Sequence, residues 1–266
     1  MNSFREWIFI GLISLFSFYG DRKEMPAKVR LCVQFVAGVV LLVGLFQWED
    51  RSYWIYLLIP FLSLYVVGTA NYYNFMDGID GIAGITGIVA FGLIALFGAL
   101  SGVNKLLLIL AGCMGFACLG FLPFNVPKAR VFMGDVGSVL LGFLFAGLVV
   151  GLSRSLNDFL VMSSFLFPFY ADEFNTEYVR IRDGENLLEP HRRHVYQLLA
   201  NEMGVDHWKV SVGYGVLQLI VGIGALALRG YGTVALVGFL GACFVGFCCF
   251  GAWIRTRSAD YADYTD

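Results

Sequence analysis

The chain consists of long apolar stretches that alternate with short polar ones. A helix needs about 20 apolar residues to cross a bilayer, and most of the apolar runs approach that length. The pattern therefore predicts an all-α, polytopic membrane bundle of about nine helices. Residues 1–254 would form one transmembrane domain, and 255–266 a cytoplasmic tail. The runs occupy residues 7–19, 29–48, 53–72, 82–100, 106–124, 136–152, 156–170, 210–228 and 231–254.

The composition agrees with this fold class and excludes others. Hydrophobic residues make up 58% of the chain and charged residues only 14%, and the mean hydropathy is +0.73. Soluble domains carry charges at about a quarter of their positions, so this chain is unlike them. The net charge of −2 offers no basic surface, so we expect no nucleic-acid partner. Membrane lipids are the expected surroundings.

The distribution of basic residues predicts the orientation of the bundle. If the chain crosses the membrane at every apolar run, thirteen of the 18 Lys and Arg residues fall on one side and five on the other. Basic residues accumulate in cytoplasmic loops, so the first side is predicted to be the cytoplasm. The same threading places Asp21 and the polar stretches at 71–80, 124–135 and 171–209 on that side. We therefore expect the chemistry to occur at the cytoplasmic face.

The first polar stretch, NYYNFMDGIDGIAG, places two asparagines and two aspartates between apolar runs. Asn71 and Asn74 are three residues apart, as are Asp77 and Asp80, so each pair would share one face of a helix. Carboxyl and amide groups at the mouth of a bundle can bind a divalent cation or a polar ligand. The alternative is that all four are loop residues solvated by water, since Asp-Gly is a common turn dipeptide.

A second polar stretch, VFMGDVGS, opens the next apolar run. Glycines on both sides of Asp135 would let backbone N–H groups approach a ligand closely. The start of a helix suits a phosphate, and a neighbouring carboxylate suits the magnesium ion that accompanies phosphates. Asp135 could instead serve only as a helix cap. Phe132 could stack on a flat base or pack in the membrane interface.

The last cytoplasmic loop is rich in cationic side chains that can donate hydrogen bonds to an anionic group. They include Arg180, Arg182, His191, Arg192 and His194. A basic loop beside a membrane can also simply contact anionic lipid heads. The PHRRH segment is not a convincing zinc site, because no cysteine or third histidine lies at helical spacing. His207 is expected at the surface.

In this order, NYYNFMDGIDGIAG, FNVPKARVFMGDVGSVLLG and PHRRHVYQLL closely resemble the motifs of the polyprenyl-phosphate N-acetylhexosamine-1-phosphate transferases, glycosyltransferase family 4. The resemblance extends from about Trp7 to Gly204. The form RDGENLLEPHRRHVYQ is similar to the branch that initiates O-antigen synthesis. The resemblance implies transfer of a sugar-1-phosphate from a UDP-N-acetylhexosamine to undecaprenyl phosphate, with release of UMP, at the bacterial inner membrane.

The resemblance also implies roles for individual residues. Asp135 would hold Mg²⁺, with Mn²⁺ as an alternative, and Asp77 and Asp80 would belong to the catalytic nucleotide and metal site. Asp21 would handle the lipid phosphate. The Phe132 ring would stack on uracil, and the histidine motif would lie over the sugar and the diphosphate. The residues expected to bind substrate are Asn71, Asn74, Asn125, Phe132, Gly134, Ser138, Asp172, Arg180, Arg182, His191, Arg192 and His194.

The match departs from the family pattern in two places. Gly20 stands where the family has the first of two adjacent aspartates, and the chain begins where the family's third helix would begin. An inactive, shortened homologue is therefore one alternative. An ion or proton transporter lined by Asp77, Asp80 and Asp135 is another, although it would need polar residues reachable from both faces. The sequence leaves open which UDP-sugar is used and whether the protein forms a homodimer.

Overall fold

The computed structural model describes residues 26–47, 57–102, 105–187, 189 and 191–265, and the regular elements of this part are all helices. The apolar run at 7–19 and Asp21 lie outside the described residues. Short turns, η2 (Ser164–Leu166), α9 (Val195–Gln197), η3 (Leu198–Glu202) and η4 (Arg229–Tyr231), separate the longer helices. These are α2 (Ala27–Gln47), α3 (Ile59–Phe75), α4 (Ile82–Ser101), α5 (Lys105–Asn125), α6 (Gly134–Leu152), α7 (Leu156–Ser163), α8 (Phe167–Arg182), α10 (His207–Leu228) and α11 (Thr233–Thr265).

Six of the described helices are long and apolar enough to cross a membrane. The chain is therefore a multi-pass membrane protein, and the predicted all-α class is confirmed. α3 has 17 residues and is not among these six; it begins at Ile59, with Pro60 in its first turn. The six candidate spans are Lys28–Phe46, Ile82–Ser101, Lys105–Asn125, Gly134–Leu152, His207–Tyr231 and Thr233–Ser258.

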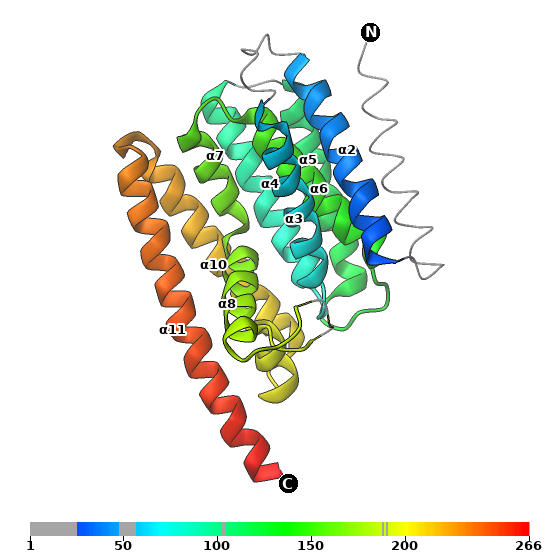
Figure 1. The fold of residues 1–266 in the computed structure, drawn as a ribbon, viewed down its shortest axis with the longest axis vertical. Helices are drawn as coiled ribbons and strands as arrows, with labels where there is room; N and C mark the ends of the chain where they lie inside the picture. The colour runs from blue at the N-terminus through cyan, green and yellow to red at the C-terminus, as the bar shows by residue number, and fades with distance from the viewer. Residues whose placement is uncertain (1–25, 48–56, 103–104, 188, 190, 266) are drawn as a thin grey trace.

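α6 lies at the centre of the bundle. All of its residues from 141 to 152 are buried, because α2, α3, α4, α5 and α7 pack around it (Figure 1). α3 approaches it most closely at Gly142, where an added Cβ would lie 2.7 Å from the Ala70 Cα and 2.8 Å from the Thr69 carbonyl oxygen. Small residues commonly allow such close contact between helices in membranes, where backbone packing contributes much of the association energy.

The outer helices expose apolar side chains. Only 11% of the α5 span and 17% of the α11 span are buried, compared with 78% of the α6 span. Lipid is as apolar as these side chains, so such surfaces need no protein cover. α11 continues as a helix to Thr265, so the tail expected from residue 255 is helical up to that point.

The apolar run at 156–170 was predicted as one span, and this is wrong. α7 ends at Ser163, the turn η2 follows, and α8 begins at Phe167 (Figure 1). Pro168 lies in the first turn of α8, where its missing N–H is tolerated; in a continuous helix its ring would clash with the Ser164 carbonyl. The loop predicted from residue 171 is wrong as well, because residues 171–182 belong to α8 and several of their polar side chains are buried.

Three connections between helices lie at one end of the bundle, the lower end in Figure 1. They are residues 76–81, 126–133 and 183–194. The Asn125 side-chain oxygen accepts a hydrogen bond from the Gly81 backbone N–H at 2.6 Å, which joins the first two. The Tyr196 hydroxyl donates to the Phe75 carbonyl at 3.0 Å, which joins the third to the end of α3. The polar stretches identified in the sequence therefore meet at one mouth of the bundle.

We expect Gly142→Ala to destabilise the protein by about 1–3 kcal/mol, because the new methyl group would collide with the α3 backbone. Gly112→Ala on α5 is the matched control, since its Cβ would meet no atom within 4 Å. Thermal unfolding of the detergent-solubilised protein, followed by tryptophan fluorescence, measures the difference. A melting temperature for Gly142→Ala equal to that of Gly112→Ala would contradict the close packing of α3 on α6.

Candidate active site

The centre of the candidate site is a contact between the last turn of α3 and the first turn of α6. The Asn74 amide nitrogen donates to Asp135 Oδ1 at 2.8 Å and to Ser138 Oγ at 2.9 Å. Ser138 is fully buried and donates in turn to the Gly134 carbonyl at 3.0 Å. Asn74, Asp135 and Ser138, all predicted as site residues, are thus brought together.

Arg30 of α2 adds a cation to this group, and sequence analysis did not single it out. Its guanidinium donates to Asp135 Oδ2 at 2.7 Å, and both side chains are about one-third exposed, at 32% and 36%. The two partners are 105 positions apart in the chain. The basic residue on one helix and the acidic residue on another gave no local signal that they would meet.

Asp77 lies close enough to Asp135 for the two carboxyls to repel each other. Burial, and then the charge of Asp135, raises the pKa of Asp77 to about 7. A cation bound between two such carboxyls would relieve their repulsion. Mg²⁺ is commonly held by one or two carboxylates together with phosphate oxygens and water, so this pair fits it. No group of three or more His, Cys, Asp or Glu side chains converges within the described residues, so substrate and water would supply the other ligands.

The Asp80 side chain contacts α10. One of its carboxylate oxygens lies 3.4 Å from His207 Nδ1, and its backbone carbonyl accepts from Ser211 Oγ at 2.8 Å. His207 was expected at the surface; its side chain is 39% exposed, but it faces this turn. Asp80 therefore connects the turn to α10, and its predicted role with Asp77 in one site stays a prediction.

Asn125 and Asn71 were predicted to bind substrate, but the structure places both in internal contacts. Asn125 accepts from the Gly81 N–H and donates to the Val131 carbonyl at 2.9 Å, so both ends of its amide hold backbone. Asn71 is one turn deeper in the bundle, where its amide nitrogen donates to Gln34 Oε1 and to the Val67 carbonyl, both at 2.7 Å. Each is buried, with 7% exposed.

Phe132 and Gly134 lie on the connection that leads into α6. The Phe132 side chain is 76% exposed, so its ring is free to contact a ligand at the mouth. Gly134 has φ +62°, a left-handed conformation that a residue with a side chain rarely adopts, and it turns the chain into α6 immediately before Asp135. Both residues lie next to Asp135, and their roles in nucleotide binding stay predictions.

Asp172 of α8 anchors the histidine motif. Its carboxylate accepts from the Val195 N–H at 2.8 Å, the Tyr196 N–H at 3.2 Å and the Tyr214 hydroxyl at 2.6 Å. Burial opposes its charge, but the neighbouring His194 ring, the Tyr214 hydroxyl and the Val195 amide outweigh burial and hold the pKa of this carboxyl below its usual range. Asp172 is fully buried and holds the start of α9, and its predicted contact with substrate stays a prediction.

Arg180 was also predicted to bind substrate, but its guanidinium holds the loop that follows α8. It donates to the Asn186 carbonyl at 2.6 Å, the Glu189 carbonyl at 3.0 Å and Glu185 Oε2 at 3.0 Å. Its side chain is 4% exposed, so the donors are committed to the loop. Arg182 is at the surface, where its guanidinium lies 2.9 Å from Asp183 Oδ1.

The histidine motif divides into buried and accessible members. His194 is buried, Arg192 is exposed, and His191 is intermediate. Burial, followed by the neighbouring His194 and Arg180 side chains, lowers the pKa of His191 to about 4, so this ring is neutral at pH 7. Arg193 pairs with Asp183 at 2.7 Å and with Glu185. His191 and Arg192 are therefore the members most open to a ligand.

Tyr196 couples this motif to the turn that carries Asp77. Its hydroxyl bonds to Phe75, and a Cβ at Gly78 would collide with that hydroxyl. The turn can therefore pack against the Tyr196 side chain only because residue 78 is glycine and has no Cβ. Tyr196 belongs to the PHRRHVYQLL motif, but its contact with the turn after α3 could not be inferred from one sequence.

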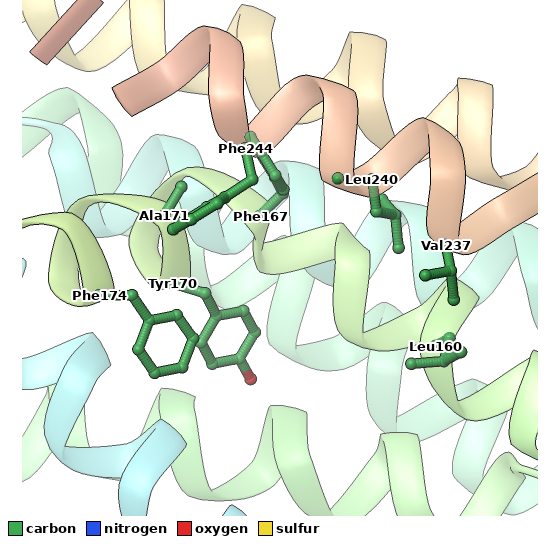
Figure 2. A pocket seen from close by; sticks show the side chains of 9 residues that line it. Leu160, Phe167, Tyr170, Ala171, Phe174, Val237, Leu240 and Phe244 are labelled. Atoms are coloured by element: carbon green, nitrogen blue, oxygen red, sulfur yellow. The ribbon is translucent and has the colours of Figure 1, made fainter. Parts of the chain in front are cut away.

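A separate apolar groove lies between α7 and α8 on one side and α11 on the other (Figure 2). It has a volume of about 370 Å³. Phe244, Leu240 and Val237 reach it from α11, and Tyr170 and Phe174 from α8 (Figure 2). The lining is almost entirely apolar, so the groove suits a hydrocarbon chain and not a nucleotide.

Residues 5–153, more than half of the chain, match the family described as Glycosyl transferase family 4. The chain belongs to glycosyl transferase family 4. The matched region includes the Asn74, Asp77, Asp135 and Ser138 group, whereas the histidine motif lies beyond its end.

Individual relatives in this family carry transferase names. The chain is 28% identical to the phospho-N-acetylmuramoyl-pentapeptide-transferase of Desulfotalea psychrophila, over 83% of this chain and 69% of that protein. It is 27% identical to a probable undecaprenyl-phosphate N-acetylglucosaminyl 1-phosphate transferase of Bacillus subtilis, over 82% and 63%. It is 28% identical to the undecaprenyl-phosphate alpha-N-acetylglucosaminyl 1-phosphate transferase of Escherichia coli, over 94% and 72%. The matches thus cover about two-thirds of the length of these relatives.

We expect Tyr214→Phe to loosen the histidine motif, because it removes the shortest hydrogen bond to the buried Asp172 carboxylate. Hydrogen bonds to charged groups contribute about 1.5–3 kcal/mol, so trypsin should cleave at Arg192 or Arg193 roughly tenfold or more faster. Tyr178→Phe on the exposed face of α8 is the control, since that side chain is 66% exposed. Equal cleavage rates in the two variants would show that Asp172 does not hold the loop through Tyr214.

Proposed function

We propose that this protein transfers the sugar-1-phosphate of a UDP-N-acetylhexosamine to undecaprenyl phosphate and releases UMP. The names of its relatives and its family membership support this reaction. The observation that carries the proposal is the contact of Asp135 with Asn74 and Arg30, at the same mouth as Asp77 and the histidine motif. We further propose that the product initiates O-antigen or another cell-envelope polysaccharide.

The chemistry exchanges one diphosphate link for another. An oxygen of the lipid phosphate attacks the β-phosphorus of the UDP-sugar, a new P–O bond forms, and the bond to the UMP oxygen breaks with its electron pair leaving on UMP. The second pKa of a phosphate is near 6, so the attacking oxygen needs little help from a base at neutral pH. Catalysis then depends on in-line positioning and on stabilising charge, which are tasks for fixed polar side chains.

The residues at the mouth can divide these tasks. Asp77 and Asp135 are suited to hold Mg²⁺, or Mn²⁺, which would supply positive charge to the diphosphate. Arg30 is held against Asp135 and adds a second positive charge that needs no metal. Arg192 and His191 offer donors to the sugar and phosphate oxygens from the loop above, and the exposed Phe132 ring offers a stacking surface to uracil.

The lipid acceptor needs an apolar surface and a polar end. The groove between α8 and α11 offers such a surface to a prenyl chain, and the phosphate would have to reach the mouth. Asp21, proposed to position this phosphate, lies outside the described residues. The bacterial sources of the relatives support an inner-membrane location, and the excess of basic residues on the mouth's side supports a site facing the cytoplasm.

We expect Asp135→Asn to lower the rate of UMP release by roughly 10²–10³-fold, because it removes a carboxylate proposed to hold the cation that would supply positive charge to the diphosphate, and keeps the size of the side chain. Asp206→Asn is the matched control, since Asp206 is exposed and, within the described part of the chain, its carboxylate pairs with nearby Lys209 at 2.7 Å. The measurement is radiolabelled sugar-1-phosphate transfer from a panel of UDP-sugars into undecaprenyl phosphate, with and without Mg²⁺. Each variant is first checked for wild-type melting temperature.

Two results would contradict the proposal. If no UDP-sugar in the panel gives labelled lipid with folded wild-type protein, the protein lacks the proposed reaction. If Asp135→Asn keeps most of the activity, the reaction stands but the assignment of Asp135 is wrong.

A further inference from the structure

His194 lies between two carboxyl groups of successive residues on α8. Its Nδ1 is 3.8 Å from Asp172 Oδ1, and its Nε2 is 3.7 Å from Glu173 Oε1. All three side chains are at most 3% exposed. These distances are slightly too long for hydrogen bonds, and among the described residues His194 Nδ1 and Glu173 Oε1 have no hydrogen-bond partner. Buried polar atoms that face one another without pairing are costly, so small side-chain shifts that close the gaps would be favourable.

The surroundings of Asp172 determine which proton His194 carries. Asp172 already accepts from two backbone N–H groups and the Tyr214 hydroxyl, so its carboxyl is ionised and can only accept. A ring nitrogen that pairs with it must therefore carry a hydrogen. This requires the tautomer of His194 with its hydrogen on Nδ1, which leaves Nε2 as an acceptor.

Glu173 is in the opposite state from its neighbour. Burial, and then the charges of Asp172 and Glu177, raises the pKa of Glu173 to about 9, against a smaller opposing effect of Arg180. The other titratable groups around it are Tyr72 of α3, and His194 and Tyr196 of the loop. A neutral carboxyl at this position has an O–H to donate, and His194 Nε2 is the acceptor it faces.

We propose that Glu173 is a positioning residue for the sugar-phosphate transfer. Its neutral carboxyl donates to His194 Nε2, while His194 Nδ1–H donates to Asp172, so that the ring is clamped from both sides. Both ring nitrogens are then committed to α8, and His194 orients the motif without contacting the diphosphate. In this proposal His194 does not bind substrate, as the family resemblance implied, but holds the loop in place. The adjoining His191 and Arg192 would contact the substrate.

The tautomer can be tested without any assay of transfer, so its outcome is independent of the proposed function on which the catalytic consequence rests. The chain has three histidines, and ¹⁵N-histidine labelling with His191→Asn and His207→Asn variants assigns the His194 signals in detergent micelles. We expect the ¹⁵N shifts of a neutral ring with its hydrogen on Nδ1. A ring with its hydrogen on Nε2, or an imidazolium at pH 7, would overturn the proposal.

Three variants then separate positioning from packing. Glu173→Leu keeps the bulk and removes the donor, Glu173→Gln keeps a donor that cannot ionise, and Glu177→Gln is the control one turn along α8, where Glu177 faces the Tyr72 hydroxyl at 3.4 Å. Loss of a partner that orients a histidine typically costs about 10–100-fold, which we expect in kcat for Glu173→Leu, together with altered His194 shifts. Glu173→Gln should restore kcat to within about threefold of wild type.

The pH profile gives a readout that a structural role would not move. Because the neutral form of Glu173 donates, wild-type activity should fall as the pH rises through about 9, and this fall should be absent in Glu173→Gln. Retention of the fall in Glu173→Gln, or of wild-type His194 shifts in Glu173→Leu, would show that Glu173 does not hold the ring.

Discussion

The buried carboxylate of Asp172 is the interaction on which the arrangement of the mouth depends. It collects donors from the start of α9 and from α10, while it is itself carried by α8. A buried charge is stable only while its donors stay in place, so these three parts of the chain cannot move apart independently. Through Tyr196, which reaches the end of α3, the same constraint extends to the turn that carries Asp77.

The break between α7 and α8 makes this interaction possible. A polar helix inside lipid would leave side chains such as Asp172, Glu173 and Arg180 without water or partners. The chain instead stops its apolar helix at Ser163 and begins a short helix that packs its polar face against the mouth. Buried polar residues that would be energetically costly within a membrane span instead hold the loop that follows α8.

Much of the fold and the centre of the site could be predicted from sequence. The long apolar runs specify helices because hydrocarbon admits few other structures, and the spacing of Asn74, Asp77 and Asp135 around two helix ends indicated where they would converge. Residue chemistry alone could not tell which donors would reach a ligand. Arg180 and Asn125 are chemically suited to bind substrate, yet their polar atoms satisfy backbone groups of the adjacent loops. Only distances distinguish these uses.

Gly78 is the point where the turn that carries Asp77 packs against Tyr196, which follows the histidine motif. The Tyr196 hydroxyl fills the space where a side chain at position 78 would lie. The turn at residues 76–81 and the segment that contains Tyr196 therefore have complementary surfaces. An exchange of residues 183–192 with those of another family member, made to alter sugar preference, would leave this joint intact. A graft that extended through Tyr196 would have to bring its own matching turn, so the natural unit of exchange ends before His194.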